Sequence, residues 1–107
     1  MILYNITISI DPSIEQEWLL WMRQFHIPKV MKTGGFTESR LCRVHAEEEG
    51  GLTYAVGYVA PSKEQYENYR KYYAAQMQKE HLEKFTGKFA AFRTLLTVVE
   101  EFKLDNQ

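Results

Sequence analysis

Cysteine is nearly absent from this chain, whose 107 residues include only Cys42. One cysteine excludes an internal disulfide and a metal site made of several cysteines, and it agrees with a reducing compartment. The first residues lack a basic segment and a small-residue cleavage site, so we expect no signal peptide and a cytoplasmic protein. Cys42 falls in the middle of a predicted strand, where we expect a small buried hydrophobic residue rather than a nucleophile.

An excess of charge of one sign is also lacking. The 13 Lys and Arg residues balance 14 Asp and Glu residues and form no basic tract. Binding to nucleic acids and to anionic membrane surfaces both require clustered positive charge. No apolar run approaches the roughly 20 residues that cross a bilayer. We therefore expect neither a nucleic acid nor a membrane as a partner.

Familiar catalytic and metal-binding motifs are missing as well. The sequence contains no glycine-rich phosphate loop and no nucleophile elbow. Its histidines, His26, His45 and His81, fall in different predicted elements and lack the His-x-x-x-His spacing of a metal site. We therefore predict no metal and no cofactor.

The pattern of apolar residues predicts four strands and two main helices. Residues 2–10 alternate with a period of two, as in a half-buried strand. Asp11 and Pro12 suit the cap and the first position of a helix, and Pro28 restricts the residue before it, so we expect this helix to end near Phe25. The predicted strands are 2–10, 36–45, 52–60 and 89–102, the predicted helices are 12–25, 28–32 and 62–83, a charged hairpin loop covers 47–51, and a polar tail covers 103–107.

This order, β-α-β-β-α-β, is that of the ferredoxin-like α+β fold. Right-handed connections place both helices on one face of a four-stranded antiparallel sheet. The predicted fourth strand is nevertheless apolar on both sides, with Phe92 and Leu96 on one and Leu95 and Val99 on the other. Soluble proteins rarely leave such a face to water. We therefore predict one domain, over residues 1–107, that forms a homodimeric α+β barrel by packing two sheets face to face.

Three stretches of the chain resemble a known family. They are Ile-Leu-Tyr-Asn-Ile-Thr-Ile at 2–8, Trp-Leu-Leu-Trp-Met with His-Ile-Pro-Lys-Val-Met-Lys-Thr-Gly-Gly-Phe-Thr within 18–37, and Gly-Lys-Phe-Ala-Ala-Phe-Arg-Thr-Leu-Leu at 87–96. Together they resemble the DUF4286 family of uncharacterised bacterial proteins over nearly the whole chain. More loosely, the helix, His-Ile-Pro, turn and strand are similar to dimeric α+β barrel proteins, including EthD-like proteins and antibiotic-biosynthesis-type monooxygenases. The resemblance implies a ferredoxin-like dimer with a cleft between helices and sheet, and it implies no activity.

His26 is the first candidate catalytic residue, because it lies at a predicted helix end beside several aromatic residues. An imidazole titrates near neutral pH and could act as a general base on an acidic C–H or O–H group of a substrate. The alternative is a histidine that caps helix carbonyls and fixes the corner at Pro28.

Arg40 and Arg93 are candidate anion-binding residues. Each lies within a predicted strand, and a guanidinium binds a carboxylate or an enolate through two hydrogen bonds. A buried Arg93 would need a partner. The alternatives are a structural pair with a glutamate, of which Glu38 shares a strand face with Arg40, and solvent exposure of Arg93.

Five aromatic residues are candidate ligand-binding residues. They are Trp18, Trp21 and Phe25 on the first predicted helix and Tyr54 and Tyr58 on the third predicted strand. Facing one another across a cleft, these rings would form a flat slot for a small hydrophobic or aromatic molecule. The alternative is an aromatic core whose hydroxyl groups reach its rim.

Two hypotheses of function follow from these residues. In the first, the protein binds a small hydrophobic or aromatic molecule in a helix–sheet cleft and acts as a cofactor-independent monooxygenase or isomerase. In the second, it is a non-catalytic homodimeric structural or interaction module. An open cavity with His26 in its wall would favour the first hypothesis, and a fully packed helix–sheet layer would favour the second.

Overall fold

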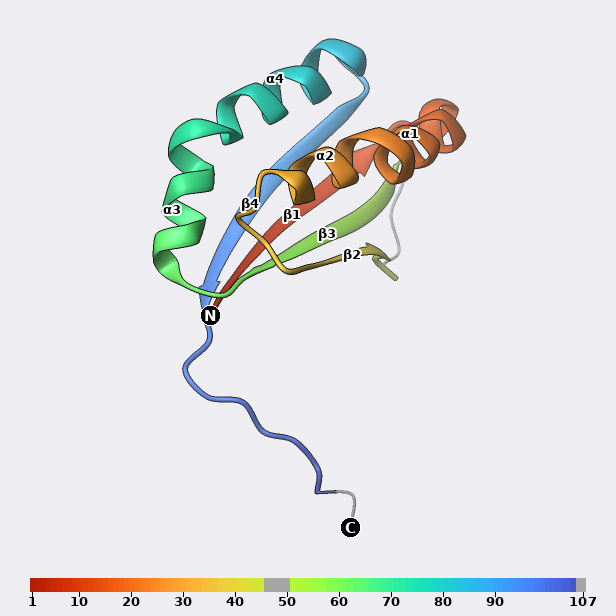
Figure 1. Ribbon diagram of the computed structural model, residues 1–107. Helices are drawn as coiled ribbons and strands as arrows, with labels where there is room; N and C mark the ends of the chain where they lie inside the picture. The colour runs from red at the N-terminus through yellow and green to blue at the C-terminus, as the bar shows by residue number, and fades with distance from the viewer. Residues whose placement is uncertain (46–50, 106–107) are drawn as a thin grey trace.

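A four-stranded antiparallel sheet with helices on one face forms the body of the molecule (Figure 1). The computed structural model describes residues 1–45 and 51–105, so the predicted hairpin loop at 47–51 lies almost entirely outside the described residues. The elements are β1 (Ile2–Ile10), η1 (Pro12–Ile14), α1 (Glu15–Trp21), η2 (Met22–His26), α2 (Ile27–Lys32), β2 (Glu38–Arg43), β3 (Leu52–Ala60), α3 (Lys63–Tyr72), α4 (Ala74–Lys84) and β4 (Phe89–Thr97). The sheet order β2-β3-β1-β4 confirms the predicted ferredoxin-like α+β fold.

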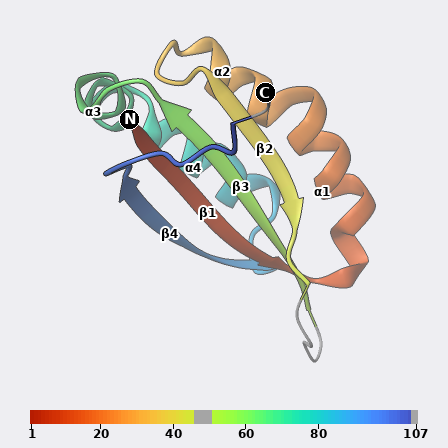
Figure 2. The same ribbon diagram turned by 90° about the horizontal axis from the view of Figure 1, so that it is seen from below.

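The central strands β1 and β3 have one packed face and one open face, because side chains alternate along a strand. Ile2, Tyr4, Ile8 and Ile10 of β1 are buried toward the helices, and Tyr4 is paired with Tyr58 of β3. The intervening residues of β1 lie on the opposite side of the sheet. Figure 2 shows that no helix of the chain covers this side within the described residues. We call it the open face.

The first helical region continues through Pro28, so the predicted break before this residue is wrong. α1 runs into the π-helical segment η2 and then into α2, and the backbone N–H of Ile27 donates to the carbonyl of Met22, five residues earlier. A proline has no N–H, and its ring crowds the carbonyl four residues before it. The wider π turn accommodates both features without ending the helix.

The π turn also changes which side chains face the sheet. Trp18 and Met22 are buried, as helical spacing predicts, but Phe25 is exposed and His26 occupies the inward position. The prediction that Phe25 shares the covered face is therefore wrong, because the wider turn rotates it outward. The same turn places His26 beneath the helix layer.

The predicted helix over 62–83 is a pair of helices, α3 and α4, that meet at Tyr73. Ser62 caps α3 as predicted, its Oγ accepting a hydrogen bond from the backbone N–H of Gln65 at 3.2 Å. At Tyr73 the backbone departs from helical geometry, with φ −128° and ψ −31°, and Figure 1 shows the change of direction. Neither proline nor glycine marks this bend in the sequence.

β4 ends at Thr97, five residues earlier than the predicted Phe102. It pairs with β1, whose first residue, Ile2, lies opposite Thr97. Beyond this pair, the N–H of Val98 donates to the carbonyl of Met1 at 3.0 Å. Residues 98–105, which we call the tail, continue without regular secondary structure.

β2 is also shorter than predicted, and its single cysteine is not buried. Cys42 is exposed and lies on the open face, opposite Ala55 of β3. The prediction of a buried residue is wrong because the helices of the chain cover the other side of the sheet.

Candidate functional site

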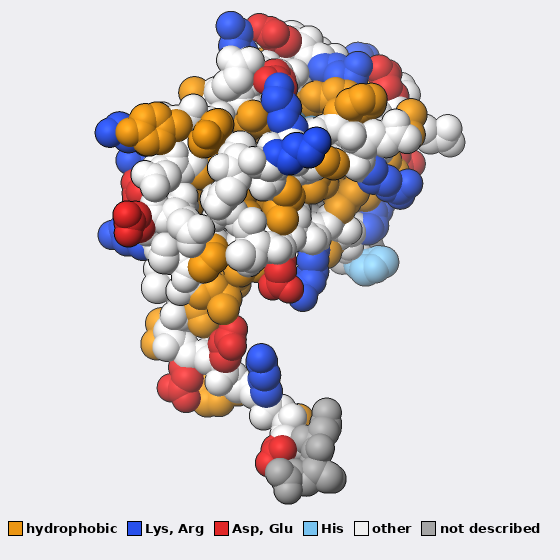
Figure 3. Space-filling model, viewed as in Figure 1, with side chains coloured by type: hydrophobic (Ala, Val, Ile, Leu, Met, Phe, Trp, Pro, Cys, Tyr) orange, Lys and Arg blue, Asp and Glu red, His pale blue; other side chains and the backbone are white. Residues whose placement is uncertain are grey.

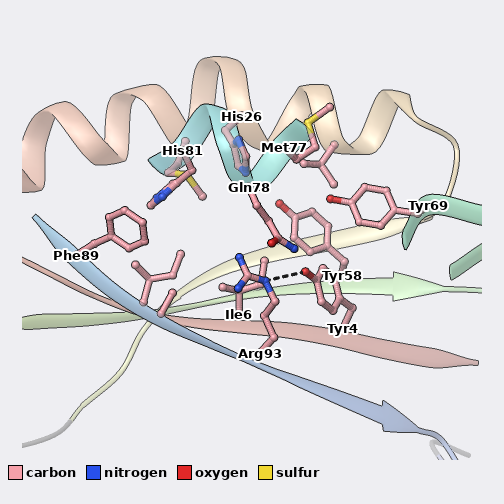
Figure 4. Close-up of a pocket in the computed structure, with 14 residues that line it drawn as sticks. Tyr4, Ile6, His26, Tyr58, Tyr69, Met77, Gln78, His81, Phe89 and Arg93 are labelled. Carbon is pink, nitrogen blue, oxygen red and sulfur yellow. Dashed lines mark hydrogen bonds between the residues drawn. The ribbon is translucent and has the colours of Figure 1, made fainter. Parts of the chain in front are cut away.

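A cavity of about 40 Å³ lies between the helices and the sheet. Figure 4 shows its walls, with η2, α2, α3 and α4 on the helix side and β1, β3 and β4 on the sheet side. This exceeds the roughly 10–15 Å³ that a cavity needs to hold one water molecule, so water can enter it. We call it the helix–sheet cavity.

His26 lies in the wall of this cavity and is 7% exposed. Its ring stacks on Trp21, with ring centroids 4.8 Å apart and planes inclined by 24°. Its Nδ1 has no hydrogen-bond partner among the described residues. Burial lowers the pKa of His26 to about 4, with Glu80 opposing the shift and Lys29 adding to it. The ring is therefore neutral at pH 7.

His81 of α4 lies beside His26, with ring centroids 5.9 Å apart. Its Nε2 accepts a hydrogen bond of 2.9 Å from the indole Nε1 of Trp18. Because an indole N–H can only donate, Nε2 carries no proton, and the proton of the neutral ring is on Nδ1. Burial, followed by the nearby His26 and Arg93, lowers the pKa of His81 to about 4. Two neutral histidines therefore share one wall of the cavity.

Tyr58 of β3 is 1% exposed and also lines the cavity. Its hydroxyl has no hydrogen-bond partner among residues 1–45 and 51–105. Burial raises the pKa of this phenol well above its ordinary value of 10, so the group stays protonated and can donate. Figure 4 shows Tyr58 and His26 directed into the same space. Buried polar groups without partners are uncommon in folded proteins and require an explanation.

The mouth of the cavity lies between α4 and the edge strand β4. Arg93 of β4 and Gln78 of α4 line it and are both exposed. The guanidinium Nε of Arg93 donates to the hydroxyl of Tyr4 at 3.1 Å, drawn as a dashed line in Figure 4. The site therefore has a positive charge at its entrance and neutral polar groups inside.

The comparison with protein families gives a match over nearly the whole chain. The profile of the domain of unknown function DUF4286 matches residues 1–99. The chain belongs to the DUF4286 family. This confirms the resemblance drawn from the sequence. None of the curated proteins compared with the chain matches it.

Solved structures with low sequence identity share the fold of this DUF4286 protein. A dimeric ferredoxin-like protein from an uncultured marine organism has 18% identity and a TM-score of 0.67, with 97% of this chain and 100% of that chain covered. A putative antibiotic biosynthesis monooxygenase from Bacillus cereus has 13% identity and a TM-score of 0.66, with 96% and 97% covered. SnoaB, a cofactor-independent oxygenase from Streptomyces nogalater, has 9% identity and a TM-score of 0.65, with 94% of each chain covered. At these identities the likeness establishes the ferredoxin-like fold.

Three of the predicted site residues come together in this DUF4286 chain. His26, Arg93 and Tyr58 line the helix–sheet cavity. Trp18 and Trp21 lie behind the histidines, the first hydrogen-bonded to His81 and the second stacked on His26. These two indoles therefore position the imidazoles.

The other predicted site residues lie elsewhere. Tyr54 donates a hydrogen bond of 2.6 Å to Oε2 of Glu15, and Phe25 is exposed on the outside of the helix layer. Arg40 lies opposite Gly57 on the open face. Arg40 and Arg93, which are both predicted from the sequence to bind an anion, therefore lie on opposite sides of the sheet.

The reasoning from sequence missed the part of the site that α4 provides, which is Met77, Gln78 and His81. His81 was considered as a metal ligand, for which its spacing is wrong. The available signal was its position four residues after Met77 and seven after Ala74, which places it on the buried stripe of the helix.

No group of three His, Cys, Asp or Glu side chains within the described residues is arranged to hold a metal ion. The described helices also include none that is long and apolar enough to span a bilayer.

Proposed function

We propose that this protein is a homodimer whose helix–sheet cavity binds a small aromatic molecule carrying a hydroxyl group and a carboxylate. The observation that carries the proposal is the pair of buried polar atoms, His26 Nδ1 and the Tyr58 hydroxyl, which have no described partner and belong to residues that line one cavity. Leaving a buried polar group unpaired costs roughly 1–3 kcal/mol. A ligand hydroxyl would satisfy both atoms, accepting from Tyr58 and donating to His26.

The mouth of the cavity suits the other end of such a ligand. Arg93 offers a guanidinium that binds a carboxylate through two hydrogen bonds, and Gln78 offers an amide beside it. A para-hydroxy acid such as 4-hydroxybenzoate would place its carboxylate at the mouth and its phenol inside. We use it below as the probe.

The cavity must widen to take an aromatic ring, because about 40 Å³ is smaller than a benzene ring requires. The side chains that would move are those of Met77, which is flexible and adapts to irregular shapes, and of Gln78 and Arg93, which are exposed. None of these movements requires a shift of the sheet.

The chemistry that fits this arrangement is proton transfer without a cofactor. His26 would accept a proton from the bound hydroxyl or from an acidic C–H group, and Arg93 would stabilise the resulting anion. His26 is a weak base in the free protein, where its pKa is about 4, and the anion formed beside it would raise this pKa and so favour the transfer. Proton abstraction of this kind begins both isomerisation and cofactor-independent oxygenation, the class named for SnoaB, a protein of the same fold.

The homodimer part of the proposal rests on the open face. Phe92 and Leu96 of β4 are large, exposed apolar side chains that lie on this face together with Leu3 and Val59. Packing two such faces together would remove them from water. A protein of the same fold from an uncultured marine organism is described as dimeric.

A second candidate function is a non-catalytic homodimeric module, and the small volume of the cavity favours it. In that case the cavity would hold a few water molecules that satisfy His26 and Tyr58. The two candidates differ in whether the cavity takes an organic ligand.

The test is an NMR titration of the ¹⁵N-labelled protein with 4-hydroxybenzoate, benzoate and 4-hydroxybenzamide. We expect 4-hydroxybenzoate to bind most tightly, because benzoate lacks the hydroxyl and the benzamide lacks the charge. Tyr58→Phe and Arg93→Gln should each weaken binding by about tenfold to a hundredfold. The matched controls, Tyr72→Phe and Arg70→Gln, change exposed residues of α3 and should bind as the wild type does. Equal binding of the three compounds, or none, would favour the non-catalytic module.

A further inference from the structure

The tail, residues 98–105, carries large apolar side chains that contact little of the chain. Val99, Phe102 and Leu104 are 94%, 85% and 89% exposed. Figure 3 shows hydrophobic groups along this segment, which stands clear of the rest of the molecule. Apolar surface of this size favours association with another apolar surface.

The tail leaves the sheet on the side of the open face. In Figure 1 it runs away from the sheet on the side opposite the helices, and in Figure 2 it passes in front of the open face. Its eight residues span about 26 Å when extended, whereas two sheets packed face to face lie about 10 Å apart. The tail is therefore long enough to reach the sheet of a second copy.

The open face has a groove of about 250 Å³ that fits an apolar side chain. Leu3, Ala55 and Val59 are among its lining residues, and Gly57 lies among them. A Cβ added at Gly57 would meet no heavy atom nearer than Oδ1 of Asn5, at 3.9 Å. The absence of a side chain at this position therefore leaves a hollow in the sheet surface.

The groove and the tail each carry charges of both signs. Arg40 and Glu38 line the groove, and the tail carries three carboxylates, Glu100, Glu101 and Asp105, and one cation, Lys103. Arg40 would lie near these carboxylates once the tail is in the groove.

We infer that each tail crosses to the partner subunit and lies in the groove of its open face, with Phe102 filling the hollow over Gly57 and the tail carboxylates near Arg40, while the β4 side of each open face, with Phe92, packs against the partner's sheet. This inference rests on the homodimer proposed above. In such a dimer, the two subunits exchange their tails.

The first test uses the single native cysteine, Cys42, which lines the groove. Phe102→Cys introduces a second thiol into the full-length chain, and mild oxidation should then produce a covalent dimer on non-reducing electrophoresis, above the level given by the wild type. Adding Cys42→Ser should abolish this excess. Lys84→Cys, on the exposed surface of α4, is the matched control and should give no excess dimer.

An internal disulfide at the mass of the monomer would show that the tail lies on its own sheet, and the absence of any disulfide would place the tail elsewhere. Either result overturns the inference.

The second test is sedimentation equilibrium of the full-length protein and of the double variant Phe102→Ser, Leu104→Ser. These residues are exposed in one chain, so the variant should fold. Its dimer should be weaker by at least about a hundredfold, since each of the two tails loses the burial of two large apolar side chains, whereas the control Leu82→Ser should associate as the wild type does. An unchanged dissociation constant of the dimer in the double variant would contradict the exchange of tails and would leave the proposed homodimer unaffected. A monomeric wild type would contradict both proposals.

Discussion

Replacing Tyr58 with phenylalanine should make the protein more stable and its ligand binding weaker. The substitution removes one hydroxyl and keeps the ring, which is packed against Tyr4 and Phe36 with centroids 6.1 and 5.0 Å away. The hydroxyl has no described hydrogen-bond partner and the residue is buried. The folded protein therefore gains no hydrogen bond from this group, although it loses the group's hydration.

The size of the effect follows from the cost of burying an unpaired hydroxyl, roughly 1–3 kcal/mol. Part of this cost is relieved if water enters the cavity, so we expect the free energy of unfolding to rise by about 1 kcal/mol. In a chain of this size such a change raises the melting temperature by about 4–8 °C.

The assay is urea unfolding followed by circular dichroism at one fixed chain concentration, because association contributes to the stability of a dimer. Tyr54→Phe is the matched control. The Tyr54 hydroxyl donates a 2.6 Å hydrogen bond to Glu15, so its removal should destabilise the protein by about 1 kcal/mol. A loss of 1 kcal/mol or more in Tyr58→Phe would refute the reasoning, since it would mean that this hydroxyl already has a partner in the folded protein.

Three further predictions concern the residues around the cavity. Stability should decrease by about 2 kcal/mol per histidine between pH 7.5 and pH 5, because the unfolded chain binds protons on His26 and His81 near pH 6.5 whereas the folded protein binds them only near pH 4. Urea midpoints of the wild type and of the double variant His26→Gln, His81→Gln at the two pH values measure this decrease. Equal sensitivity to pH in the two proteins would contradict the prediction. Trp18→Phe removes the donor to His81 and leaves a void, so it should lower the free energy of unfolding by about 2–3 kcal/mol in the same assay. A change of less than about 0.5 kcal/mol, which is the size of an ordinary surface substitution, would show that the hydrogen bond is dispensable. Gly35→Ala would place a Cβ 2.9 Å from the Cβ of Tyr69 and should destabilise the protein by about 1–3 kcal/mol; an unchanged melting temperature would show that the loop moves aside freely.

Much of the fold could be predicted from the sequence because its signals are local and periodic. The alternation of residues 2–10 identifies β1, and Ser62 identifies the start of α3. With four strands and two helical regions in the order β-α-β-β-α-β, the sheet order follows from the handedness of the connections. These parts required no knowledge of contacts between distant residues.

The errors arise where a distant partner or an unusual turn decides the outcome. Pro28 predicts the end of a helix, and the π turn at Met22–His26 allows the helix to continue. The pairing of β4 with β1 ends at Thr97, opposite Ile2, and the apolar sequence after Thr97 does not reveal this end.

The candidate site could be predicted only in part for the same reason. His26, Tyr58 and Arg93 were identified by residue type and position in their own elements. His81 is held in place by a hydrogen bond from Trp18, 63 residues away, and local patterns carry no information about such a bond. The opposite faces of Arg40 and Arg93 follow from the register of two strands that are not adjacent in the sheet.

The central claim is that His26 accepts a hydrogen bond from a ligand inside the helix–sheet cavity, and imidazole ¹⁵N NMR of the histidine-labelled protein tests it most directly. On titration with 4-hydroxybenzoate, the Nδ1 resonance of His26 should shift, whereas Nε2 of His81 should keep the shift of a nitrogen that accepts a hydrogen bond from an indole. Imidazole resonances that stay unchanged at saturating probe, or a response confined to residues of the open face, would contradict the claim.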